Sequence, residues 1–312
     1  MGKDMREVYT ETLIALAEKD DRICVLEADL MNATGTRAFR DAFPDRAFDV
    51  GVSEADMVGV ASGLSAEGKI PFAASFATFA SRRTYDQFFL SANYARLNVK
   101  LVGTDPGITA LYNGGTHMPF EDVGLMRLIP DLTIVEPSDI VSCEALVRAV
   151  AEHEGCVYLR MHRKGSQVIH AADQEFRLGK GVLLRDGDDV TLVAAGFVMV
   201  PEALKAAELL SEKGVSAAVI DMHTVKPLDE ELMLQYAGKT GAVVTCENHS
   251  IIGGLGGAVA ELLSEKQPTF MGRIGSRNKF GEVGDYEYLI RNYELTAEDI
   301  AAEALEVLKR RG

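Results

Sequence analysis

Cysteine is scarce in this chain and shows no pairing pattern. Among the 312 residues there are four cysteines, at positions 24, 143, 156 and 246, and no two of them have CxxC spacing. That scatter argues against a disulfide framework and against a zinc site, both of which need clustered thiols. We therefore predict no metal site on this chain.

Positive charge and long apolar runs are also lacking. The 32 lysines and arginines are outnumbered by 47 aspartates and glutamates, which gives a net charge of −15. This balance opposes nonspecific binding to nucleic acid or anionic membranes, so an anionic ligand must be held by a few local cations or by a partner. No apolar run approaches the roughly 18 residues that span a bilayer, and the first residues lack the basic-then-apolar order of a signal peptide. We expect a soluble, cytoplasmic protein with neither nucleic acid nor membrane as a partner.

The sequence does contain a regular alternation of strand and helix patterns. Hydrophobic residues make up 47% and charged residues 25%, values typical of a folded globular chain. Short apolar runs predict strands at 22–29, 47–52, 70–76, 99–105, 133–139, 156–162, 189–196, 215–222 and 242–248. Helical patterns lie at 4–19, 37–43, 54–68, 80–97, 139–153, 201–213, 229–237 and 297–310. Apolar strands between helices favour parallel sheets covered on both faces.

The alternation is interrupted once, around 164–188, by a polar, irregular and glycine-containing stretch. Such a break is typical of a connection between domains. The sequence therefore predicts two doubly wound α/β domains, the first over 1–170 and a smaller one over 189–312, joined by a linker at 171–188.

One carboxylate stands out for its position. Glu54 ends the strand-like FDVGVSE and begins a helix rich in glycine and alanine. A glutamate in a first helical turn is favoured by the helix dipole and needs no further role. However, ligands of open α/β sheets bind at the carboxyl ends of strands, and small residues such as Gly59 and Gly63 allow another chain to approach the helix closely.

Two further motifs are individually weak. Phe76 and Phe79, in SFATF, share a face if the turn is helical, although two core phenylalanines would show the same spacing. His117 follows paired glycines in YNGGTHMPFED, a loop that suits close backbone approach to a ligand, although a lone loop histidine is more often a surface residue. The string GGLGGAV at 253–259 lacks the preceding apolar strand of a nucleotide-binding loop.

Taken together, these motifs resemble the C-terminal half of transketolase. EADL, GVSEADMVGVASGLS, PFAASFATF, NGGTHMPFED, LRMHR and IDMHTVKPLD occur in the family's order between Met5 and Leu308. The resemblance implies a thiamine-diphosphate pyrimidine-binding fold followed by a smaller transketolase C-terminal domain. It also implies transfer of a two-carbon ketol unit from a ketose phosphate, or a similar anionic sugar, to an aldose phosphate.

The resemblance assigns cofactor-binding roles to specific positions. Glu54 matches the catalytic carboxylate that hydrogen-bonds the aminopyrimidine ring of thiamine diphosphate and acts as its acid–base partner. Phe76 and Phe79 match the aromatic pair that packs on that ring. Asp29 and Leu30 match an Asp-Leu pair that lines the cofactor pocket.

Other positions match substrate-binding residues. His117 corresponds to a histidine that faces the substrate and assists proton transfer, which makes it the second expected catalytic residue. Arg163 and Arg6 correspond to arginines that hold the substrate phosphate, a role that suits a guanidinium fork.

The substrate pocket departs from the family pattern at four positions. Asn113 stands where transketolases carry an aspartate, Asp105 where they carry a histidine, and Ala33 where a serine helps bind phosphate. Arg82 replaces a pocket tyrosine. We expect Asp105 to place a negative charge beside the donor's anion, so that the preferred donor is unusual: a branched or deoxy sugar phosphate, or a ketose whose terminal anion is not phosphate, for instance a sulfonate. The alternative is that Asp105 points away and the ordinary donor is kept.

The family's Gly-Asp-Gly…Asn motif, which holds the diphosphate and Mg2+, is missing; the nearest strings are RDGDD at 185–189 and VGDYE at 283–287. The resemblance therefore implies an N-terminal transketolase subunit as partner, carrying that motif, in an α2β2 assembly whose active sites lie at the interface.

Three alternative functions stay open: a split deoxyxylulose-phosphate synthase, a 2-oxo acid dehydrogenase β-subunit and a noncatalytic subunit. The NGGTH loop favours ketol transfer, and retention of Glu54, Phe76, Phe79 and His117 argues against a noncatalytic copy.

Overall fold

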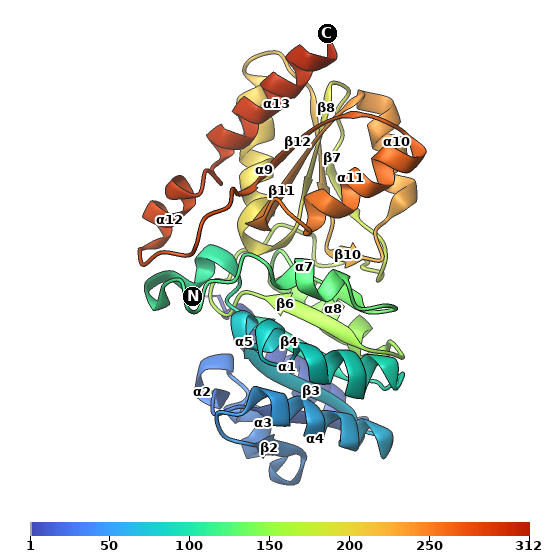
Figure 1. Cartoon of the computed structure of the whole chain (residues 1–312), viewed down its shortest axis with the longest axis vertical. Helices are drawn as coiled ribbons and strands as arrows, with labels where there is room; N and C mark the ends of the chain where they lie inside the picture. The colour runs from blue at the N-terminus through green and yellow to red at the C-terminus, as the bar shows by residue number, and fades with distance from the viewer. Residues whose placement is uncertain (1) are drawn as a thin grey trace.

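The two sheets of the protein lie in two domains stacked along its long axis. A computed structural model describes residues 2–312. The first domain carries the N-terminus, and the second ends in the C-terminal helix at the far end of the molecule (Figure 1). Within the described residues, no helix is long and apolar enough to cross a membrane.

The first sheet has seven strands in the order β10-β5-β6-β4-β3-β1-β2. The strands in that order are β10 (Thr224–Lys226), β5 (Thr133–Val135), β6 (Val157–Met161), β4 (Lys100–Thr104), β3 (Ile70–Phe76), β1 (Ile23–Glu27) and β2 (Ala47–Asp49). All neighbours except β10 and β5 are parallel. The strand order reverses at β1 and β3, and in doubly wound sheets this switch point opens the crevice that receives a ligand.

Helices cover both faces of this sheet, as the apolar strands require. They are α1 (Met5–Ala17), α2 (Met31–Thr34), α3 (Arg37–Ala42), α4 (Glu54–Ala66), α5 (Ala77–Arg82), α6 (Tyr85–Gln87), α7 (Asp122–Arg127) and α8 (Ile140–Glu152). Short 3-10 helices η1 (Pro44–Arg46) and η3 (Gly107–Asn113) and a π-helical segment η2 (Phe88–Tyr94) complete the domain. The predicted single helix at 80–97 was wrong, because the chain turns between α5 and α6 and then continues with π-helical bonding.

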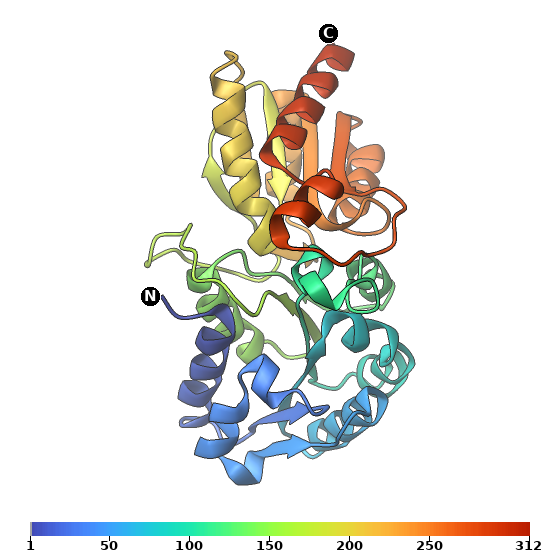
Figure 2. The same cartoon turned by 90° about the vertical axis from the view of Figure 1, so that its left-hand side faces the viewer.

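The second sheet has the order β12-β11-β8-β9-β7. Its strands are β7 (Val182–Arg185), β8 (Val190–Ala194), β9 (Ala217–Asp221), β11 (Ala242–Ser250) and β12 (Phe270–Ser276). The helices are α9 (Gly196–Ser211), α10 (Glu230–Thr240), α11 (Leu255–Lys266), α12 (Tyr286–Asn292) and α13 (Ala297–Arg311). Figure 2 shows the helices packed around this sheet.

Helix α9 begins five residues earlier than the predicted helix at 201–213. Proline is favoured in a first helical turn, and Pro201 is the first residue of the predicted helix. In the structure Pro201 lies inside the helix, where it has no N–H to donate to the carbonyl of Phe197 four residues earlier. The Gln167 side chain donates to that carbonyl oxygen instead, at 2.8 Å.

The boundary between the domains is less simple than predicted. The expected linker at 171–188 contains β7, which pairs antiparallel with β9, so the second sheet begins inside it. Conversely, β10 follows β9 in the chain but returns to the first sheet, where it pairs antiparallel with β5. Lys226 of β10 donates to the carbonyl oxygen of Arg127 at 3.0 Å.

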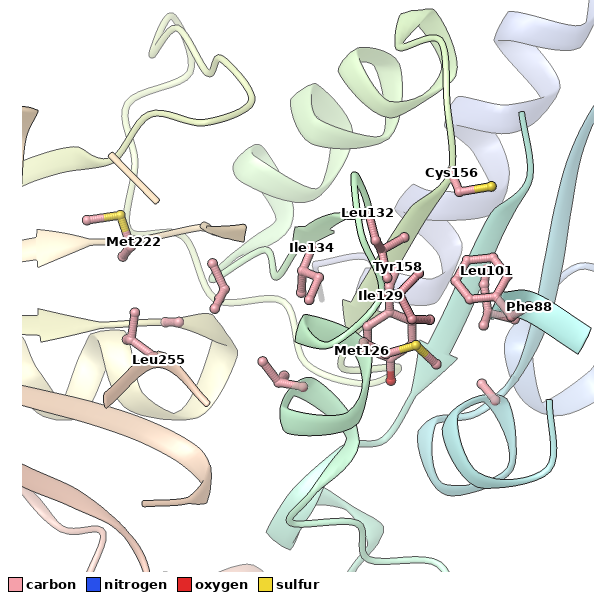
Figure 3. Packing of buried hydrophobic residues seen from close by; sticks show 14 of the residues in the cluster. Phe88, Leu101, Met126, Ile129, Leu132, Ile134, Cys156, Tyr158, Met222 and Leu255 are labelled. Atoms are coloured by element: carbon pink, nitrogen blue, oxygen red, sulfur yellow. The ribbon is translucent and has the colours of Figure 1, made fainter. Parts of the chain in front are cut away.

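An apolar core continues from one domain to the other. Met126, Ile129 and Ile134 of the first domain belong to the same buried cluster as Met222 and Leu255 of the second (Figure 3). A shared core of this kind holds two sheets in one fixed arrangement.

A buried ionic group lies at the same interface. Arg160 of β6 donates to the carboxylates of Asp122, at 2.8 Å, and Glu136, at 2.6 Å. It also donates to the main-chain oxygen of Asn248 in the second domain at 2.8 Å. Three acceptors therefore satisfy a guanidinium that is only 1% exposed.

Candidate active site

The switch point of the first sheet gathers several of the predicted site residues. Phe76 ends β3, Asp29 and Leu30 follow β1, and Glu54 begins α4 after β2. The carboxyl ends of parallel strands lie at one edge of a sheet, so these residues share that edge. The main-chain N–H groups of Asp29 and Gly51 both donate to Asp49, at 2.9 and 3.0 Å, which ties the ends of β1 and β2 together.

Three rings form an aromatic cluster at this edge. The rings of Phe76 and Phe79 are 6.2 Å apart between centroids. The His117 ring meets both edge-on, at 5.8 Å from Phe76 and 5.1 Å from Phe79. All three side chains are only partly buried. The predicted phenylalanines are therefore not plain core residues, because both stay partly exposed at this edge of the sheet.

The loop that carries His117 is held by its glycines. Gly114 has a φ of +70°, which side chains rarely permit. A Cβ on Gly115 would lie 2.4 Å from the carbonyl oxygen of Gly281, so this loop packs against the segment between β12 and α12. The Thr116 hydroxyl lies 2.9 Å from His117 Nδ1, which leaves Nε2 directed elsewhere.

Glu54 is buried, and among residues 2–312 its side chain has one hydrogen-bonding partner, which the sequence did not reveal. Its side chain is 5% exposed, and both carboxylate oxygens accept from Nη1 of Arg83, at 2.9 and 3.1 Å. The Arg83 guanidinium lies 4.2 Å over the ring of Phe79. Arg83 was not among the predicted site residues. Its position four residues after Phe79 could have indicated that the two side chains meet, because residues at that spacing lie on one face of a helix.

Two arginines converge on one carbonyl group near the same edge. Arg6 and Arg163 each donate from Nη1 to the main-chain oxygen of Ala33, at 3.1 and 3.2 Å. The Arg163 guanidinium also lies 4.8 Å from the centroid of the Phe76 ring. Their convergence places two guanidinium groups beside the aromatic cluster.

Asp105 has a partner that the sequence did not reveal. Its carboxylate is not a free charge, because it forms an ion pair with the Arg163 side chain. The main-chain N–H of Arg163 also donates to Asp105 Oδ1, at 3.3 Å. The two residues are 58 positions apart, and adjacent strands β4 and β6 bring them together.

Arg82 lies apart from this group. It forms an ion pair with Glu121 and lines a cavity of about 500 Å3 between the His117 loop and the segment after β12. Asn113, Asp105 and Arg163 line a separate cavity of about 380 Å3. The structure therefore does not bring Arg82 together with the other predicted substrate residues.

Family comparisons agree with this geometry. The family model "Transketolase, pyrimidine binding domain" matches residues 1–167, and "Transketolase, C-terminal domain" matches residues 179–300. The chain belongs to the transketolase family. This confirms both the predicted resemblance and the predicted fold, and the pyrimidine-binding domain implies thiamine diphosphate as the cofactor.

The similar proteins span the same two domains. The 6-deoxy-6-sulfo-D-fructose transketolase subunit SqwH of Clostridium sp. (strain MSTE9) is 53% identical over 98% of this chain and 95% of its own length. A 1-deoxy-D-xylulose-5-phosphate synthase of Heliobacterium modesticaldum is 37% identical, but this chain covers only 46% of that protein. A solved structure described as "Split gene transketolase, inactive beta4 tetramer" is 41% identical, has a TM-score of 0.91, and is matched over the whole of both chains.

The site residues fit the aminopyrimidine half of thiamine diphosphate. That ring needs an apolar face and a carboxylate at one ring nitrogen. Phe76 and Phe79 present partly exposed rings, and the buried Glu54 carboxylate is linked to Phe79 through Arg83. Among residues 2–312, no cluster of three or more His, Cys, Asp or Glu side chains could hold a metal ion.

Proposed function

We propose that this chain is the C-terminal subunit of a two-chain, thiamine-diphosphate-dependent transketolase. It transfers a two-carbon ketol unit from an anionic ketose to an aldose phosphate. The observation that carries the proposal is the grouping of Glu54, Phe76, Phe79 and His117 at the switch point. The partner subunit carries the missing Gly-Asp-Gly motif, the diphosphate site and Mg2+, in an α2β2 assembly. The similar split-gene transketolase, described as an "inactive beta4 tetramer", supports a chain that needs such a partner.

Glu54 holds the cofactor's aminopyrimidine and exchanges a proton with it. When bound, thiamine diphosphate supplies the electron sink for cleavage of the ketose carbon–carbon bond. Each Glu54 oxygen keeps a lone pair beyond its bond to Arg83, so the carboxylate can pair with a ring nitrogen in place. Phe76 and Phe79 pack on the ring, a contact worth about 1 kcal/mol beyond burial. Asp29 and Leu30 line the same pocket.

His117 acts on the substrate. Its Nδ1 is next to the Thr116 hydroxyl, so Nε2 is the nitrogen available to donate to, or accept from, a ketose oxygen. Arg6 and Arg163 hold the donor's terminal anion, and Asn113, which lines the same cavity as Arg163, contacts a donor hydroxyl. A sulfonated ketose is the donor class that we propose, supported by the name of the 53% identical relative.

Reconstitution tests this function. The chain is mixed with an N-terminal transketolase chain that contains the Gly-Asp-Gly motif, and ketol transfer is measured with thiamine diphosphate and Mg2+. We expect transfer only from the mixture, and calorimetry should show tight cofactor binding only there. Micromolar binding by this chain alone would contradict the divided site, and activity with pyruvate in place of a ketose would indicate a deoxyxylulose-phosphate synthase.

A further inference from the structure

We propose that Asp105 is a specificity-determining residue that makes the donor's anion site prefer a singly charged terminal group to a doubly charged one. The inference rests on the proposed function, because it assumes that the donor's terminal group reaches Arg163. It goes beyond that function by assigning the discrimination to one carboxylate and one ion pair.

The charges of the side chains that line the cavity sum to one net positive charge. The cavity of about 380 Å3 is lined by two cationic side chains, Arg163 and Lys164, and by the carboxylate of Asp105. His162 also lines it, but burial lowers the pKa of His162 to about 4, so the ring is neutral near pH 7. Burial raises the pKa of Tyr286, another lining residue, to about 12, so its hydroxyl is also uncharged. The cavity therefore offers one net positive charge.

The second arginine does not change that balance. Arg6 reaches the same Ala33 carbonyl as Arg163, but its Nη2 lies 3.7 Å from the carboxylate of Asp4. Both arginines at the Ala33 carbonyl are thus paired with an aspartate of this chain, Arg6 with Asp4 and Arg163 with Asp105. Only Lys164 contributes a cation without a carboxylate partner among the described residues.

Asp105 also occupies one edge of the Arg163 guanidinium, which would otherwise be free to bind a phosphate. Its Oδ2 accepts from Nε and lies against Nη2 of Arg163, while Nη1 donates to Ala33. A bidentate arginine–phosphate contact uses two parallel N–H donors. The Asp105 carboxylate takes the Nε–Nη2 edge, and its side chain is 7% exposed, so little water screens its charge.

The two candidate terminal groups each present three outer oxygens, but they differ in charge, and the phosphate is attached through an additional bridging oxygen. A phosphate monoester has a second pKa near 6, so it carries about −1.5 to −2 charge at pH 7. A sulfonate has three similar oxygens but stays singly negative through this range. Beside Asp105 the second negative charge is repelled, and the single charge matches the net charge of the cavity.

The test compares two donors that differ only at the terminal group, fructose 6-phosphate and 6-deoxy-6-sulfofructose, on the reconstituted two-chain enzyme. We expect Asp105→Asn to lower the sulfonate-to-phosphate ratio of kcat/KM by about tenfold, chiefly by raising kcat/KM for the phosphate. The matched control is Asp45→Asn, an exposed aspartate of η1 with no side-chain hydrogen bond among the described residues. That variant should leave the ratio unchanged.

A second measurement needs no variant. In the wild-type enzyme the same ratio should fall between pH 8 and pH 5.5, because the phosphate gains a proton there and the sulfonate does not. This pH dependence should weaken in Asp105→Asn. A ratio that is unchanged by the variant and flat with pH would overturn the inference. Absence of ketol transfer from either donor by the wild-type pair would instead contradict the proposed function.

Discussion

Nη1 of Arg83 lies within hydrogen-bond distance of both carboxylate oxygens of Glu54, at 2.9 and 3.1 Å. One nitrogen thus serves both oxygens of a buried carboxylate, while the Arg83 side chain is itself about half exposed. Because a carboxylate has about four acceptor positions, Glu54 can take a further partner without losing this one. Arg83 accordingly holds the carboxylate in place and leaves acceptor positions free for the cofactor contact that we propose.

Glu54→Gln should separate proton transfer from binding geometry. The amide keeps the shape of the side chain and can still accept from Arg83, so the folded state should persist. Loss of the acid–base step should lower turnover of the reconstituted enzyme by about 10²–10⁴. Turnover is measured alongside thermal unfolding, and turnover within a factor of three of wild type would leave Glu54 with only a role at the start of α4.

His117→Ala should affect the substrate and not the cofactor. His117 packs edge-on against Phe76 and Phe79 but makes its only side-chain hydrogen bond among residues 2–312 to Thr116. We expect proton exchange at the reactive cofactor carbon to continue at nearly the wild-type rate while ketol transfer falls by about 10²-fold. Equal losses in the two assays would place His117 in cofactor activation or in the fold.

Glu27 should make stability depend on pH. Its carboxyl is fully buried, and burial raises its pKa to about 8, against the opposing effect of hydrogen bonds from Thr34 and Thr36. The folded protein therefore keeps this proton to higher pH than the unfolded chain. The resulting stabilisation is complete below about pH 4.5 and is lost as pH rises through about 8.

Glu27→Gln should remove that dependence. Between pH 5 and pH 8.5, the free energy of unfolding of wild type should fall by about 2–4 kcal/mol relative to the variant. Denaturant unfolding at several pH values measures the difference. The exposed Glu18→Gln serves as the control and should follow wild type. Parallel curves for wild type and Glu27→Gln would show that Glu27 does not titrate in this range.

Arg160→Met should destabilise the junction between the domains. Removing the guanidinium leaves Asp122 and Glu136 buried without their shared cation, which typically costs about 3–5 kcal/mol. Arg148→Met provides the comparison, because Arg148 pairs with Glu144 on an exposed helix face, and such pairs contribute about 0.5 kcal/mol. Similar unfolding free energies for the two variants would mean that the buried group does not hold the domains together.

The apolar runs predicted the central strands well, because burial on both faces leaves a strong pattern, whereas the edge strands β7 and β12 were not predicted. The runs at 70–76 and 242–248, for example, correspond to β3 and β11. The pattern could not reveal β10, which is three residues long and gains its partner from the other domain. Local periodicity carries no information on such distant pairing.

In the site, too, residues in local motifs could be predicted from the sequence, and pairings between distant segments could not. Glu54, Phe76 and His117 were identifiable because each lies in a local motif. The pairings of Glu54 with Arg83 and of Asp105 with Arg163 depend on which strands become neighbours in the sheet. The consequence for Asp105 is large, because a carboxylate expected to face the donor alone instead forms an ion pair with Arg163.

The return of β10 to the first sheet has a consequence for the order of folding during synthesis. Strand β5 is complete at Val135, but its outer neighbour is not made until Lys226 has emerged from the ribosome. Until then the hydrogen-bonding edge of β5 stays open, and open edges pair readily with other chains. Domains usually fold in the order in which they are translated. Here the first domain is closed only after β7, β8 and β9 of the second have been made, so the nascent chain depends on its second half to complete its first sheet.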